Sequence, residues 1–149
     1  MEAGWDGKSV KLAYDKYQAL PDLLLSLLTS ELSSEAADIR PQIGSVESVF
    51  PALDIIRRAG PPDINRQEIY DQACVHLGGR VWHIREIAAR TVASLLLGDD
   101  WTSRMQGLLK SADSSTNHHH GVLMAINFFL DRQMTLDVTV LLGKSTYSG

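Results

Sequence analysis

The sequence predicts an all-α protein whose helices stack in pairs, as an α-solenoid of about three helix pairs. Apolar residues recur at helical spacing along most of the chain, from Val10 to Leu130. Glycine, proline and short polar stretches separate these segments, which indicates short connections. Helix starts expected near Ser45, Val81 and Asn117 are about 36 residues apart, a period that suits a helix-pair solenoid.

The first 45 residues are expected to form a helical N-terminal extension. Val10–Leu20 has a helical pattern, which Pro21 breaks or restarts. Asp22–Leu32 is leucine-rich and predicts a short, very apolar helix. Ser33–Ser45 is polar and contains a proline and a glycine, so we expect a loop there.

Two helices are expected next, each ended by glycine. The first begins at Ser45 or Ser48, either of which could cap it, and runs to Ala59. Pro51 fits this helix if it starts near Ser48 and otherwise implies a kink. Its expected inner face is Val49, Phe50, Leu53 and Ile56. Gly60-Pro61-Pro62 ends it.

The second of these helices covers Ile64–Leu77, with Asp63 as its expected N-cap. Its expected inner residues are Tyr70, Ala73, Cys74 and Leu77. Gly78-Gly79 ends it.

The segment Val81–Leu97 has the clearest amphipathic pattern and is expected to be the central helix of the stack. Glu86 and Arg90 are four residues apart with the acid first, the better orientation for a helical ion pair. Neighbouring helices are expected on both sides. The expected inner face is Ile84, Ile87, Ala88, Thr91, Val92, Leu95 and Leu96.

Two more helices follow. Asp99 or Asp100 is expected to cap Trp101–Ser111, with Trp101, Met105, Leu108 and Leu109 in line, and Asn117 to cap His118–Arg132. Val122–Leu130 is apolar nearly all round, which predicts burial on several sides. Thr135–Leu142 is rich in β-branched residues and fits either a final helix or a short strand.

One sequence motif refines the fold prediction. Ile84-Arg85-x-x-Ala88, followed by Leu95-Leu96, resembles the second helix of a HEAT repeat, so the solenoid is expected to be HEAT/armadillo-like. Residues 1–149 are expected to be a single α-helical repeat segment, with the HEAT-like region at 46–133 and the helical extension at 1–45. The residues expected to be mostly buried are Leu53, Ile87, Ala88, Leu95, Leu109 and Ile126.

Composition narrows the class of protein. Of the 149 residues, 44% are hydrophobic and 21% charged, which is ordinary for a globular domain, and no apolar run is long enough for a membrane span. The net charge of −4 argues against autonomous nucleic-acid binding, although residues 57–110 carry +2. The N-terminus shows no secretory signal, and the single cysteine, Cys74, fits a reducing compartment, so a cytoplasmic location is expected.

Two sequence motifs, taken together, carry a family resemblance. Ile84-Arg85-Glu86-x-Ala88-Ala89-Arg90 is followed about 30 residues later by Asn117-His118-x-His120-Gly121-Val122-Leu123. Together they resemble the large HEAT-repeat proteins that include thyroid adenoma-associated protein and the non-catalytic partner of a tRNA ribose 2′-O-methyltransferase. The resemblance covers roughly Val46–Leu130.

The resemblance implies a non-catalytic scaffold segment that supports 2′-O-ribose methylation of the tRNA anticodon loop. It implies a separate tRNA 2′-O-methyltransferase subunit as partner, with tRNA bound as part of a larger complex. It implies neither a cofactor nor a catalytic residue in this segment. Proteins of this family also have an arginine-rich motif followed by Ser-Ala-Gly. Arg57-Arg58-Ala59-Gly60-Pro61 is only superficially similar to it, because the serine is missing. The simpler interpretation of these residues is the end of a helix.

The candidate partner- or tRNA-contacting residues are Arg85, Arg90, Asn117, His118 and His120. Both arginines have a structural interpretation, as ion pairs or capping groups between repeats, and a functional one, as forks for tRNA phosphates. The histidine run could suggest zinc, together with His76, His83 and Cys74, but its members face different directions and no metal-ligand spacing is present. No metal site is therefore expected.

Two other classes of function compete with the scaffold. The nearer alternative is a generic HEAT-like adaptor that binds proteins and has no RNA role. A small hydrolase or metal enzyme is weaker, because there is no phosphate loop and no nucleophile elbow. Because the apolar helices at both ends lack a polar outer face, self-association of the segment is also expected.

Overall fold

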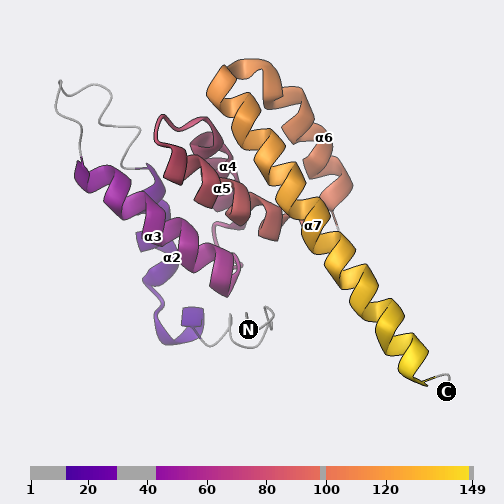
Figure 1. Ribbon diagram of the computed structural model, residues 1–149. Coiled ribbons are helices and arrows are strands. Elements are labelled where there is room, and N and C mark those ends of the chain that lie inside the picture. Colours follow the sequence, from indigo (N-terminus) through magenta and orange to yellow (C-terminus); the bar gives the residue numbers. More distant parts are fainter. Residues whose placement is uncertain (1–12, 30–42, 98–99, 148–149) are drawn as a thin grey trace.

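The computed structural model of the protein is all-α, as predicted (Figure 1). It describes residues 13–29, 43–97 and 100–147, with side chains described at 13–29, 47–97 and 100–135. A short helical turn at 13–16 precedes the main helices, and these described residues contain no strand. The helices are α2 (Leu20–Thr29), α3 (Ile43–Ala59), α4 (Arg66–Val75), α5 (Trp82–Leu95), α6 (Trp101–Ser111) and α7 (Thr116–Tyr147), with 3-10 turns η2 (His76–Gly78) and η3 (Ala112–Ser114).

The helices pack in a stack with α5 in the middle. α2 packs against α3 and α4, while α5 packs against α3, α4 and α7 (Figure 1). α6 lies beside α7, to which η3 connects it. The prediction that the central helix has neighbours on both sides is confirmed. α3, α5 and α7 begin at Ile43, Trp82 and Thr116, so the repeat is close to the predicted period.

The inner face of α5 is the predicted one. All seven residues expected there are buried, namely Ile84, Ile87, Ala88, Thr91, Val92, Leu95 and Leu96. Thr91 is the polar member, and its Oγ1 lies 2.7 Å from the carbonyl oxygen of Ile87 and 3.0 Å from that of Leu53. The single hydroxyl therefore connects α5 to the backbone of α3 without leaving a buried polar atom unpaired.

α3 begins earlier than predicted. Because its first residue is Ile43, Ser45 and Ser48 lie inside the helix rather than at its cap, and Pro51 is interior. Pro51 has no N–H to donate to the carbonyl four residues before it. It lies on the exposed side, where that carbonyl can bond to water. Phe50, expected on the inner face, is 43% exposed, which corrects that prediction.

The connection from α3 to α4 forms a buried corner. Gly60 has φ 82°, a left-handed conformation that favours glycine, and its N–H donates to Ile56 O at 2.8 Å, so the predicted glycine stop is confirmed. Asp63 is not the N-cap of the next helix. That position is Asn65, also left-handed at φ 62°, whose Nδ2 donates to Asp22 Oδ1 at 3.1 Å instead of capping the helix.

α6 has the predicted bounds, but fewer of its residues are buried than predicted. Of its four in-line residues only Leu108 is buried, and Leu109 is 54% exposed, so the prediction of a buried Leu109 is wrong. The reason is position: α6 is at the edge of the stack, where α7 is its main neighbouring helix among the described residues. Ile126, expected in the core, is partly buried.

α7 differs most from prediction. It starts at Thr116 and runs through Arg132 to Tyr147, so the ambiguous segment Thr135–Leu142 is helical. Within Val122–Leu130, one side is buried against the stack, but Leu123 and Leu130 are 53% and 50% exposed, which corrects the expectation of burial on several sides. Within the described residues no helix has the length and apolarity to cross a membrane.

Candidate interaction surface

The second of the two motifs that carry the family resemblance lies where η2 crosses the start of α7. A Cβ added at Gly121 would lie 2.9 Å from the Cα of Leu77 and would overlap its carbonyl oxygen. Since real Cβ atoms essentially never come so close to backbone, only glycine lets α7 approach η2 at this point. The glycine of the Asn-His-x-His-Gly word is therefore a packing residue.

His118 belongs to the same crossing. Its Nε2 lies 3.0 Å from Ser111 Oγ on α6, and its Cβ would be 3.5 Å from a Cβ built at Gly78. Ser111 Oγ also donates to Leu108 O at 2.8 Å, so its proton is directed at that carbonyl and its lone pairs can accept from the imidazole. The pair therefore holds α6 against α7, and the hydroxyl is not poised as a nucleophile. Burial lowers the pKa of His118.

The other polar residues of the Asn-His-x-His-Gly motif lie on or near the surface. Asn117 is half-buried, and His119 and His120 are exposed. Asn117 is not the cap of α7, because the backbone N–H of His118 donates to Ser115 Oγ at 3.1 Å. Over the described ranges there is no group of three or more His, Cys, Asp or Glu side chains that could hold a metal ion.

Arg85 faces its own connecting loop. Its Nη1 donates to the carbonyl oxygens of Gly79, at 2.8 Å, and Arg80, at 3.1 Å, while its Nε is buried without a hydrogen-bond partner. The guanidinium thus closes the loop between η2 and α5. Arg85 therefore caps carbonyl groups of its own loop, rather than groups of another repeat, and it uses one nitrogen of the guanidinium fork to do so.

Arg90 lies on the surface between α5 and α7. Its Nη2 is 3.2 Å from Glu86 Oε1, which is the ion pair predicted from their spacing. Its guanidinium carbon stands 4.3 Å from the centre of the Phe128 ring on α7. The side chain remains 47% exposed, so two contacts hold the guanidinium in place while part of it faces solvent.

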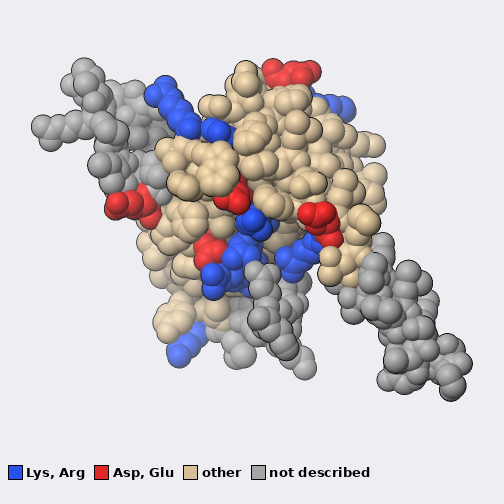
Figure 2. All heavy atoms as spheres, in the orientation of Figure 1, with Lys and Arg blue, Asp and Glu red and all other residues tan. Residues whose placement is uncertain are grey.

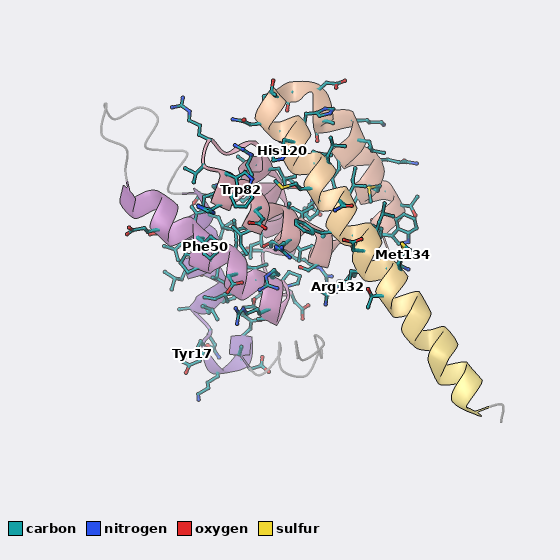
Figure 3. The ribbon with its side chains drawn as sticks, in the orientation of Figure 1. Tyr17, Phe50, Trp82, His120, Arg132 and Met134 are labelled. Atoms are coloured by element: carbon teal, nitrogen blue, oxygen red, sulfur yellow. The ribbon has the colours of Figure 1, made fainter. Side chains whose placement is uncertain are left out.

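Basic side chains gather on one face of the molecule. Figure 2 shows Lys and Arg side chains over the junction of α3, α5 and α7, with acidic side chains between them, and Figure 3 places Arg132 at the same junction. α3 ends with Arg57 and Arg58, which share Asp54 at 2.8 and 2.9 Å, and the Arg58 side chain is 71% exposed. We call Arg57, Arg58, Arg90 and Arg132 the arginine face.

The sequence pattern predicts only part of this surface. Arg90 is a predicted contact residue, whereas Arg57 and Arg58 are predicted as part of a helix end and Arg132 has no predicted contact role. The available signal was the surplus of basic residues in the middle third of the chain. Helical periodicity alone could not show that three helices bring their arginines to one face.

Cys74 lies in an apolar and aromatic environment rather than a reactive one. Burial is the largest cause that raises its pKa, to about 11, so at neutral pH the thiol is protonated. The neighbouring Tyr70 also has its pKa raised, first by burial, and the Arg104 guanidinium carbon lies 4.4 Å from the centre of its ring. A protonated thiol is neither a good nucleophile nor a ready metal ligand.

Comparison with known proteins gives a family for the chain. A family model described as Trm732, C-terminal TPR repeats, matches residues 2–129. The match includes most of the N-terminal extension, in which no sequence motif resembles the family. No solved structure matches the chain. TPR repeats are stacked helix pairs with a period of 34 residues, so the description agrees with a helical repeat architecture.

Proposed function

Because the chain belongs to the family of the Trm732 C-terminal TPR repeats, we propose that it is a non-catalytic segment of a tRNA-modification scaffold. Membership implies a role in tRNA modification as a partner subunit. The finer proposal is that it supports 2′-O-ribose methylation in the tRNA anticodon loop by a separate methyltransferase. A cytoplasmic location, and the HEAT-like character of the repeats, are part of the same proposal.

The observation that carries this proposal is the family match over residues 2–129, which spans nearly all of the described stack. The described side chains support a scaffold in two further ways. The Ser111–His118 pair and the Cys74 thiol both lack an activated nucleophile, as described above. The helix-pair architecture offers long surfaces of the kind that solenoids use for binding.

We propose the arginine face as the surface that meets tRNA. Among the arginines of this face that form a described ion pair, Arg58 and Arg90 are the most exposed. Asp54 orients the Arg58 guanidinium, and Glu86 orients that of Arg90. An arginine fork that is already oriented loses less side-chain entropy when it binds a phosphate. Because the whole chain carries −4, we expect the segment alone to bind tRNA weakly and to contribute to a surface shared with its partner.

The test is made in cells of the source organism, on the protein as it is encoded there. The gene is deleted, and ribose methylation at each anticodon-loop position of purified tRNA is measured by mass spectrometry. We expect methylation at one or more positions to disappear and to return with the wild-type gene. Unchanged methylation after deletion would contradict the tRNA role and favour the adaptor that binds only proteins.

A second arm of the experiment tests the arginine face. The Arg58→Ala/Arg90→Ala variant should restore methylation poorly, while Arg66→Ala/Arg80→Ala removes the same charge from exposed positions elsewhere and should restore it fully. Protein levels are checked by blotting. If both variants restore methylation equally, the arginine face has no part in tRNA binding, whereas the scaffold role still stands.

A further inference from the structure

α7, the longest helix that the structure describes, leaves one side of residues 123–134 uncovered. α7 has 32 residues, which at about 1.5 Å of rise per residue makes it roughly 48 Å long. Figure 1 shows that it runs well past the other helices of the stack. An isolated helical stretch is only marginally stable in water, so a helix that projects in this way gains from a partner along its length.

The uncovered side has a regular apolar pattern. Leu123, Leu130 and Met134 are 53%, 50% and 66% exposed, and the exposed Asn127 lies between the two leucines. The spacing of these four residues is four, three and four, which is the a/d spacing of a coiled coil. We call Leu123, Asn127, Leu130 and Met134 the α7 seam.

The seam points away from the rest of the protein. The opposite side of α7 carries Val122, Ala125 and Phe129, all buried against the stack. Figure 3 shows Arg132 and Met134 on opposite sides of the helix, with Arg132 on the side of α3 and α5. The seam is thus a mostly apolar side of α7 that no described helix covers.

We propose that the α7 seam pairs with the α7 seam of a second copy of this chain, as a parallel two-stranded coiled coil. This inference is independent of the proposed function. It deepens the expectation of self-association by naming the helix, the orientation and the register.

Asn127 is the reason for choosing a second copy. Its side-chain amide both donates and accepts hydrogen bonds, so two copies of Asn127 facing each other can satisfy one another. A single asparagine at an a position is known to fix register and the two-stranded state in parallel coiled coils. An antiparallel pair would instead set Asn127 against a d position, where the seam has Leu123 and Leu130, and would leave the amide without a partner.

The residues beside Asn127 do not oppose this pairing. In a parallel coiled coil, a g position faces the e position five residues later in the other strand. With Asn127 at a, Ile126 is at g and Asp131 at e, so the carboxylate faces an alkyl chain rather than another carboxylate. Two-fold symmetry along α7 also places the two helix stacks on opposite sides of the coiled coil.

Cross-linking tests the register. In the full chain with Cys74→Ala, the single-cysteine variants Leu123→Cys, Asn127→Cys and Met134→Cys are oxidised separately. Each should form a disulfide with its own copy, because a parallel dimer brings identical positions together. Gln106→Cys, at an exposed position of α6, is the control and should remain monomeric. Efficient disulfides only in a mixture of Leu123→Cys with Met134→Cys would indicate an antiparallel pair and overturn the proposal.

Light scattering tests the interface itself. The wild-type chain should have the mass of a dimer at tens of micromolar, and Leu130→Glu should raise the dissociation constant at least about tenfold. Leu109→Glu changes a leucine of similar exposure on α6 and should leave the dimer intact. Circular dichroism shows whether each variant is folded. A monomeric wild-type chain, or equal effects of the two glutamates, would contradict the proposal.

Discussion

The two ends of the helix stack are held together by different kinds of contact. Around α2, α3 and α4, side chains bond to backbone carbonyls that are distant in sequence: Tyr14 Oη donates to Gly60 O at 2.6 Å, and His76 Nε2 lies 2.8 Å from Leu28 O. Around α6 and α7 the corresponding bond is local, between Ser111 and His118, only seven residues apart. There the packing depends on rings and on glycine, with Trp101 5.5 Å from Phe129 between ring centres.

This difference shows how the stack is built. The N-terminal side is closed by polar bonds that each fix one geometry, because a buried donor or acceptor that loses its partner is costly. The C-terminal side is a hairpin of α6 and α7 attached to η2 by close packing at Gly121, with an apolar outer side. The C-terminal side therefore offers a surface on which another element can pack.

The largest effect is expected at the attachment of the C-terminal hairpin. Gly121→Val would force a branched side chain into the backbone of Leu77, so we expect a loss of about 4 kcal/mol or more in the free energy of unfolding, measured by urea denaturation. Gly107→Ala on α6 is the control, since nothing lies within 4 Å of its added Cβ. That variant should gain up to about 1 kcal/mol from helix propensity. Equal destabilisation by the two changes would mean that α7 does not need its close approach.

A core truncation in α5 should affect both sides of the stack. Leu95 is 5% exposed, and Leu95→Ala should cost roughly 2–5 kcal/mol of unfolding free energy in urea melts. Leu109→Ala, on the exposed side of α6, should change it by less than about 0.5 kcal/mol. A loss below that limit for Leu95→Ala would show that the inner face of α5 is wrongly assigned.

The polar connection between α3 and α5 can be removed with little change of shape. Thr91→Val deletes the hydroxyl that faces the carbonyl oxygens of Leu53 and Ile87, so we expect a loss of about 1 kcal/mol in thermal or urea unfolding. Thr102→Val, at an exposed position of α6, should have almost no effect. If the two variants are equally stable, the bond across to α3 adds nothing to stability.

The smallest effect concerns pH and the local bond of the C-terminal hairpin. Burial lowers the pKa of His118 below 6.5, so the unfolded chain binds this proton more readily than the folded one. The contribution of His118 to stability is therefore intact above that pH and is lost as the pH falls through it. Between about pH 7.5 and 5.5, the urea midpoint of the wild type should fall more than that of His118→Gln. His119→Gln, at an exposed position, should follow the wild type; identical pH profiles for all three proteins would refute this role.

Sequence periodicity was a good guide to the helices and a poorer one to their ends. α6 has its predicted bounds, and α5 differs by a residue or two, because glycine stops and apolar spacing are local properties. The predicted N-caps Asp63 and Asn117 were wrong. The N-cap of α4 is Asn65, and at the start of α7 the hydroxyl of Ser115 accepts the helical N–H. Leu109 was wrong because a pattern shows which side of a helix is apolar, but not whether another helix covers it.

The candidate surface was harder to predict than the fold. Arg85 and Arg90 both lie off the apolar side of α5, and nothing in their spacing separates their roles. The structure separates them because the loop at Gly79 and Arg80 turns its carbonyls toward Arg85, whereas Phe128 and Glu86 hold Arg90 at the surface. Which of the candidate residues contact tRNA or a partner stays a prediction.

Cys74 provides the protein with a built-in reporter of its own fluctuations. As the only cysteine, largely enclosed and with its pKa raised to about 11, it reacts with a thiol reagent mainly when α4 moves away from its neighbours. The labelling rate of the unmodified protein therefore measures how often the N-terminal side of the stack opens. Because the thiol lies far along the chain from the α7 seam, the same rate in seam variants shows whether that opening is coupled to events at the other end of the molecule.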